Sequence, residues 1–299
     1  MKPFLALVKR NVKLFFKDKG MFFTALITPG ILLVLYATFL GNVYKDSFLS
    51  ALPEGLNMAE DLINGCVSAQ LTSSILAVSC VTVAFCSNML MVQDKVTGSI
   101  RDLTITPVRK STLALSYYFA SLLSTLIICF VAMGLCLIYM GFMGFYMSGL
   151  DVVLLLSDVV LLVTFGTALS SILNFFLSTQ GQISAVGSII SAGYGFICGA
   201  YMPISQFSPA LQKVVAFLPG TYGTTLVRNH AMGGVFREME RVGFPQEAVD
   251  GMKDTVDFNF YFFGHPVSVG AMYAVLGGTV LLLIAGYVLL NMKKRHKRS

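Results

Sequence analysis

The chain reads QDKVTGSIRDLTITP over residues 93–107, a charged stretch between two long uncharged runs at 67–92 and 111–150. Uncharged runs of 18 or more residues predict membrane-spanning helices, because about 20 residues cross a hydrocarbon core of about 30 Å. The stretch is therefore predicted to be a loop between two spans. A charged, amphipathic loop in this position favours contact with a partner.

Composition places the chain among integral membrane proteins. Of its 299 residues, 56% are hydrophobic and 12% are charged, and the mean hydropathy of +0.76 excludes a soluble globule of this size. The uncharged run at 159–212 holds two helices, because STQGQ at 178–182 interrupts it. The predicted fold is an all-α membrane protein with six transmembrane helices, at about 21–43, 67–92, 113–141, 152–177, 183–204 and 266–292.

The basic residues predict the orientation of these spans. Residues 1–20, the loop at 93–110 and the tail at 293–299 together carry 15 of the 21 Lys and Arg residues. With six spans these segments lie on one side, which the positive-inside rule makes the cytoplasm. The chain is thus predicted to be a multi-pass protein of the cell membrane with both termini cytoplasmic. Attraction to anionic membrane lipid accounts for the net charge of +6 without any nucleic acid partner.

Two further segments are predicted beside the spans. Residues 1–20 place Phe4, Val8 and Val12 at helical intervals beside lysines, which favours an amphipathic helix at the cytoplasmic interface over an ordinary basic flank. Residues 205–265 begin with apolar pieces too short to cross and continue with a more polar part, which predicts an external re-entrant helical segment and a small cap. The residues expected to shape this segment as a gate are Pro203, Pro209, Pro219 and Tyr222.

Motifs of catalysis are absent from the sequence. It contains no Gly-x-x-x-x-Gly-Lys-Ser/Thr motif, so any ATP that drives transport must be hydrolysed by another chain. The three histidines lie outside the predicted spans, and the six cysteines lack Cys-x-x-Cys spacing, which is typical of packing residues rather than metal ligands. The sequence therefore predicts no catalytic residue, no metal site and no cofactor bound by this chain.

Polar residues within the second predicted span are candidates for a substrate path. Gln70, Ser73 and Asn88 lie in this span, and such side chains prefer a protein interface or a wet cavity to lipid. Helix packing is the alternative interpretation of all three. Arg228, in the external segment, is a further candidate contact for a substrate.

Asp158 lies seven residues after Asp151 on the same predicted helical face. A carboxylate within the membrane is costly, which makes Asp158 a candidate functional residue. A span that begins at Val159 would instead leave both carboxylates at the external interface. Asp158 supports the alternative of an ion-coupled secondary transporter, whereas a membrane-embedded transferase lacks a convergent site.

The stretch at 93–107 has an apolar face of its own. Val96, Ile100 and Leu103 recur at helical intervals, and Pro107 prevents the helix from continuing. An apolar stripe of this kind needs a groove in a partner or the bilayer surface.

The stretch resembles the coupling-helix segment of type-2 ABC exporter permeases, a family that exports antibiotics, lipids and polysaccharides. Similar regions follow in the same order, including Gly199-Ala200-Tyr201-Met202-Pro203 and Leu218-Pro219-Gly220-Thr221-Tyr222. The resemblance implies that residues 94–106 dock into a nucleotide-binding ATPase subunit. The residues expected to make this contact are Asp94, Val96, Gly98, Ile100, Arg101, Leu103, Thr106 and Pro107. The family usually opens this segment with glutamates, whereas this chain has Gln93, Asp94 and Lys95.

The resemblance also implies the wider assembly. Two permeases, identical or different, would pair with two ATPase subunits, and ATP and Mg²⁺ would bind to the ATPases. The expected function is export of a drug, lipid or glycolipid-like substrate by a permease that is not itself an enzyme.

Overall fold

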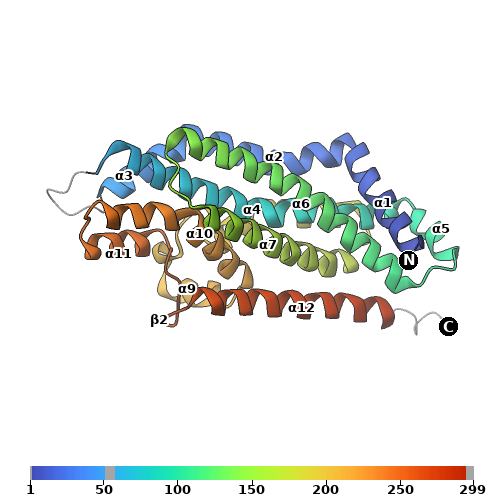
Figure 1. Cartoon of the computed structure of the whole chain (residues 1–299). Helices are drawn as coiled ribbons and strands as arrows, with labels where there is room; N and C mark the ends of the chain where they lie inside the picture. Colours follow the sequence, from blue (N-terminus) through green and yellow to red (C-terminus); the bar gives the residue numbers. More distant parts are fainter. Residues whose placement is uncertain (1, 51–57, 294–299) are drawn as a thin grey trace.

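A computed structural model describes residues 2–50 and 58–293 as an elongated bundle of helices (Figure 1). The first half contains α1 (Lys2–Lys17), α2 (Lys19–Leu35), the π-helix η1 (Tyr36–Leu40), α3 (Gly41–Ser50), α4 (Glu60–Val96), α5 (Ser99–Ile105) and α6 (Lys110–Met143). The second half contains α7 (Gly149–Phe176), α8 (Gln180–Ile197), the 3-10 helix η2 (Ile204–Gln206), α9 (Pro209–Val215), α10 (Pro219–Arg241), α11 (Gln246–Thr255) and α12 (Val269–Lys293). A two-residue antiparallel pair, β1 (Tyr261–Phe262) and β2 (His265–Pro266), precedes α12.

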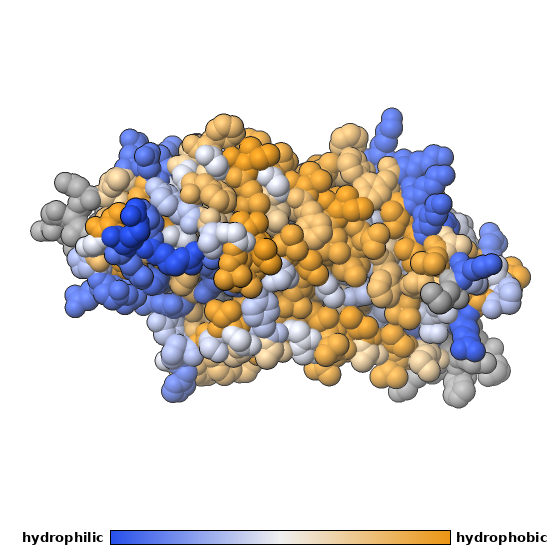
Figure 2. Space-filling view, viewed as in Figure 1, coloured by the Kyte–Doolittle hydropathy of each residue, from blue (hydrophilic) through white to orange (hydrophobic). Residues whose placement is uncertain are grey.

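The long helices run side by side along one axis (Figure 1). One end of the bundle, here named the α5 end, holds α5, α1 and the C-terminal end of α12. The other end, here named the α11 end, holds α3 and α11. Hydrophobic residues cover the middle of the visible surface, and hydrophilic residues gather at both ends (Figure 2). This distribution matches a protein whose apolar middle lies in the lipid bilayer and whose two ends lie in water.

Five stretches of helix among the described residues are long and apolar enough to cross a membrane: Lys19–Ser50, Glu60–Val96, Lys110–Met143, Gly149–Phe176 and Val269–Met292. Each corresponds to one predicted span and is longer than the prediction at one end or both, except the last. The fifth predicted span, 183–204, corresponds to α8, which is more polar and ends at Ile197. It ends there because Gly199 adopts a left-handed conformation (φ +73°) and the amides of Ala200 and Tyr201 bond back to the Gly195 carbonyl.

The centre of the bundle is α4. Of its most apolar window, 94% is buried, and it packs against α2, α6, α7, α8 and α10. The stretch Lys19–Ser50 and α12 lie at the outside of the bundle and face lipid. Only 20% and 17%, respectively, of their most apolar windows are buried. Small and hydroxyl-bearing side chains suit α4 to this position, since they let neighbouring helices approach closely.

The segment after α8 departs from the prediction of short pieces. α9 is short, but α10 is a continuous helix of 23 residues that packs against α4, α7 and α12. It begins at mid-depth, where Pro219 and Gly220 lie with Phe165 of α7, and runs to the α11 end. Gly223 does not break it; a side chain there would collide with Leu162, so this glycine permits close helix packing.

Candidate functional site

The predicted coupling stretch forms two helices rather than one. α4 ends at Val96, Gly98 takes a left-handed conformation (φ +82°), and α5 then covers Ser99–Ile105. The predicted common face of Val96, Ile100 and Leu103 is therefore wrong, because the turn at Gly98 separates Val96 from the other two. Glycine suits this turn, since a side chain at positive φ is strained.

The apolar face of α5 turns toward the permease itself. Ile100 and Leu103 are partly buried against the chain's own core, so this face packs within the chain. The exposed surface of α5 and the turn after it includes Arg101, Thr106 and Pro107, all of which were predicted contacts. It also includes Ile105, whose side chain is 82% exposed. Ile105 is not one of the residues predicted from the apolar face of this stretch.

Asp94, another predicted partner contact, is buried and paired within the chain. Its carboxylate accepts hydrogen bonds from the Arg10 guanidinium at 2.7 Å and from the Tyr117 hydroxyl at 2.5 Å. The Asp94 carboxylate raises the pKa of Arg10. These contacts tie α1 and α6 to the end of α4, so Asp94 stabilises the start of the predicted coupling stretch from within the chain.

Lys95 and Asn88 tie α4 to α7. The Lys95 ammonium donates to the carbonyl oxygens of Asn174, Phe175 and Leu177 at 2.7–3.0 Å, and so caps the end of α7. The Asn88 amide donates to the hydroxyls of two serines of α7 at 2.9 and 2.7 Å. The structure therefore favours packing as the role of Asn88.

Gln70 and Ser73, from the predicted substrate path, are also fully buried in α4. The Ser73 hydroxyl donates to the Gln70 carbonyl oxygen at 2.8 Å. The side-chain amide of Gln70, in contrast, has no hydrogen-bonding partner among the described residues. A buried amide without a partner is rare and costly, which marks this position as unusual within the packed helix.

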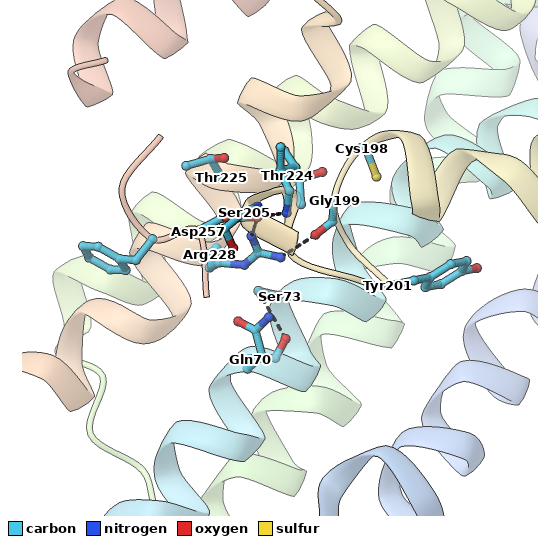
Figure 3. Close-up of polar contacts among 12 residues, drawn as sticks. Gln70, Ser73, Cys198, Gly199, Tyr201, Ser205, Thr224, Thr225, Arg228 and Asp257 are labelled. Atoms are coloured by element: carbon cyan, nitrogen blue, oxygen red, sulfur yellow. Dashed lines mark hydrogen bonds and ion pairs between the residues drawn. The ribbon is translucent and has the colours of Figure 1, made fainter. Parts of the chain in front are cut away.

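Arg228 of α10 lies close to Gln70 in a buried cluster (Figure 3). Its guanidinium donates to the Gly199 carbonyl oxygen at 2.8 Å and lies 3.7 Å from the Asp257 carboxylate. Asp257 in turn accepts bonds from the backbone amides of Ile204 and Ser205. Burial raises the pKa of Asp257. The cluster joins α10, the turn after α8 and the loop before β1.

The predicted gate residues lie at or near the starts of the elements that follow α8. Pro203 precedes η2, Pro209 and Pro219 each begin a helix, and the Tyr222 hydroxyl donates to the Ala216 carbonyl oxygen at 2.8 Å. Proline suits the first turn of a helix, because its missing N–H would have no partner there.

Asp158 lies inside α7 rather than before the start of a span. Its carboxylate is 2.5 Å from Nδ1 of His230 on α10 and accepts a hydrogen bond from the Tyr273 hydroxyl on α12. About two helical turns toward the α11 end, Asp151 pairs with Arg237 of α10. Asp151 and Asp158 are seven residues apart in the sequence, and so are His230 and Arg237. This matching spacing is the sequence signal for two antiparallel helices joined by both pairs.

The six cysteines are all buried and free, as the prediction of packing residues requires. Among the described residues, no group of three or more His, Cys, Asp or Glu side chains is arranged to hold a metal ion.

Comparison with known proteins identifies the family. A family model described as ABC-2 type transporter matches residues 2–231. No curated protein and no solved structure gives a significant match. The family match covers most of the 299 residues and accompanies five helices able to cross a membrane. The chain therefore belongs to the ABC-2 type transporter family, as a multi-pass membrane subunit of an ABC transporter.

Proposed function

We propose that this chain is the permease of an ATP-driven exporter, moving a drug, lipid or glycolipid-like substrate out of the cell. A separate nucleotide-binding subunit binds ATP and Mg²⁺ and hydrolyses the nucleotide. Both termini and α5 lie in the cytoplasm, as the distribution of basic residues favours. α8 serves as the sixth membrane segment: its 18 helical residues extend about 27 Å from the cytoplasmic side, and its end meets the start of α10 inside the bundle.

The observation that supports this proposal most is the construction of α5. The helix is anchored by Ile100 and Leu103 on its inner side and presents Ile105 and the following Thr106, both exposed, on its outer side. An apolar side chain that is 82% exposed at a hydrophilic end of the bundle is typical of a contact surface. The ATPase subunit docks on this outer surface.

A second permease, identical or different, pairs along α8 and the neighbouring lipid-facing helices. α8 packs mainly against α4 and leaves Ile189, 68% exposed, together with several glycines and serines on its outer side. Small residues at helical spacing favour close helix association in a membrane. The substrate passes between the two permeases, with α9 and α10 closing the outer exit.

The ion-coupled carrier is not part of this proposal. Asp158 is held by His230 and Tyr273 from two neighbouring helices, which accounts for its burial through packing between α7, α10 and α12.

The test is copurification of the ATPase subunit encoded beside this chain, before and after Ile105→Asp combined with Thr106→Asp. Loss of association is expected, because the change replaces the exposed apolar contact with two carboxylates. Val242→Asp provides the control, since Val242 is 53% exposed at the α11 end. Undiminished copurification of the α5 variant, or equal loss in the control, would contradict docking through α5.

A further inference from the structure

A cavity of about 300 Å³ lies behind α5, between the ends of α4, α6 and α12. Its apolar lining includes Met91, Leu113 and Ala114, and three cations, Lys95, Arg101 and Lys110, also line it. Among the residues that the structure describes, no Asp or Glu lines it. Cavities of this size are large enough to hold a small ligand or a headgroup.

The three cations differ in what they already bind. The Lys95 ammonium is fixed by carbonyl oxygens at the end of α7. Arg101 and Lys110 are exposed, and within the described part of the chain neither side chain forms an ion pair. The nearest carboxylate of α4, Asp94, is occupied by Arg10 and Tyr117. The cavity thus offers two uncompensated positive charges beside an apolar surface.

We propose that this cavity binds an anionic glycerophospholipid of the cytoplasmic leaflet. Its phosphate lies between Arg101 and Lys110, and the first carbons of its chains contact the apolar lining. The lining residues sit at the ends of the spans, which is the depth of the headgroups, and basic pockets between spanning helices at this level suit anionic headgroups. Because α5 supplies Arg101, the lipid holds α5 against the bundle. This inference does not depend on which substrate is exported.

The test measures thermal unfolding of the purified full chain in a neutral detergent. A maleimide dye reports unfolding, because all six cysteines are buried and free. Dioctanoyl-phosphatidylglycerol is expected to raise the midpoint in a saturable way, whereas dioctanoyl-phosphatidylcholine and inorganic phosphate are not. Equal stabilisation by phosphatidylcholine would overturn the proposal, and equal stabilisation by inorganic phosphate would assign the site to free anions instead of lipid.

Substitutions locate the site. Lys110→Gln and Arg101→Gln are each expected to weaken the apparent affinity for phosphatidylglycerol about five-fold, the equivalent of about 1 kcal/mol per cation. Arg109→Gln is the matched control, because Arg109 is exposed, adjacent to Lys110 and absent from the lining. Equal weakening by the control would show a diffuse surface effect. If Lys110→Gln left the lipid effect intact but reduced copurification of the ATPase, the cavity would belong to the docking surface and the proposal would be wrong.

Discussion

Arg10→Gln tests whether the contact between α1 and α4 stabilises the α5 end of the bundle. The Arg10 guanidinium lies 2.7 Å from the Asp94 carboxylate, and their side chains are 31% and 8% exposed. Removing one partner of a fully buried pair costs about 3–5 kcal/mol, whereas an exposed pair contributes about 0–1 kcal/mol. Because Arg10 is partly exposed and Tyr117 still donates a hydrogen bond to Asp94, we expect the free energy of unfolding to fall by about 2 kcal/mol.

The assay is the dye-monitored thermal unfolding described above. For a chain of this length, 2 kcal/mol corresponds to a decrease of about 3 °C in the midpoint. Lys13→Gln removes an exposed cation from the same helix and is expected to leave the midpoint nearly unchanged. Combining Arg10→Gln with Asp94→Asn removes both charges, so the double variant should lose less than the sum of the two single variants. Additive losses, or equal shifts for Arg10→Gln and Lys13→Gln, would refute the reasoning.

Three further substitutions are expected to shift the same midpoint. Arg228→Gln leaves the buried Asp257 carboxylate without its cation and should lower the free energy of unfolding by about 3–5 kcal/mol. Arg241→Gln, at an exposed position, is the control and should lower it by less than about 0.5 kcal/mol. Gly166→Val places a side chain within about 3 Å of α4 and should lower the free energy of unfolding by at least about 1–3 kcal/mol. Gly134→Val is the control, because Gly134 faces open space. Equal losses for the two variants would contradict close packing between Gly166 and α4. Gln70→Leu removes a buried amide that has no partner and should raise the midpoint by the equivalent of about 1 kcal/mol; a lower midpoint would show that the amide makes a stabilising contact.

The long helices could be predicted from the sequence because hydropathy is a local property. An uncharged run long enough to cross the hydrocarbon core has few alternatives to a helix, and five such stretches of helix are present. The amphipathic helix at the N-terminus follows from the spacing of Phe4, Val8 and Val12 in the same way. The positions of Gly98 and Pro107 likewise bracket α5 to within a few residues.

The orientation of each helix face could not be predicted, because it depends on residues distant in the chain. The partner of Asp94 lies 84 residues away, and that of Asp158 lies 72 residues away. An apolar stripe on α5 is compatible with a partner's groove and with the chain's own core, and the structure shows the second for Ile100 and Leu103. The prediction of short pieces in this segment likewise missed that Gly223 permits contact with α7 inside a continuous helix.

These contacts determine how docking at α5 would reach the rest of the bundle. Only Thr97 and Gly98 separate α5 from α4, and the last turns of α4 are joined to α1, α6 and α7 through Asp94 and Lys95. A force on α5 therefore displaces α4 with its neighbours instead of bending a loose loop. α4 extends about 55 Å as one helix and carries Gln70 against the Arg228 cluster near the opposite end. If α4 moves as one helix, the Arg228 cluster of the outer segment lies beside the part of α4 that would carry the movement there.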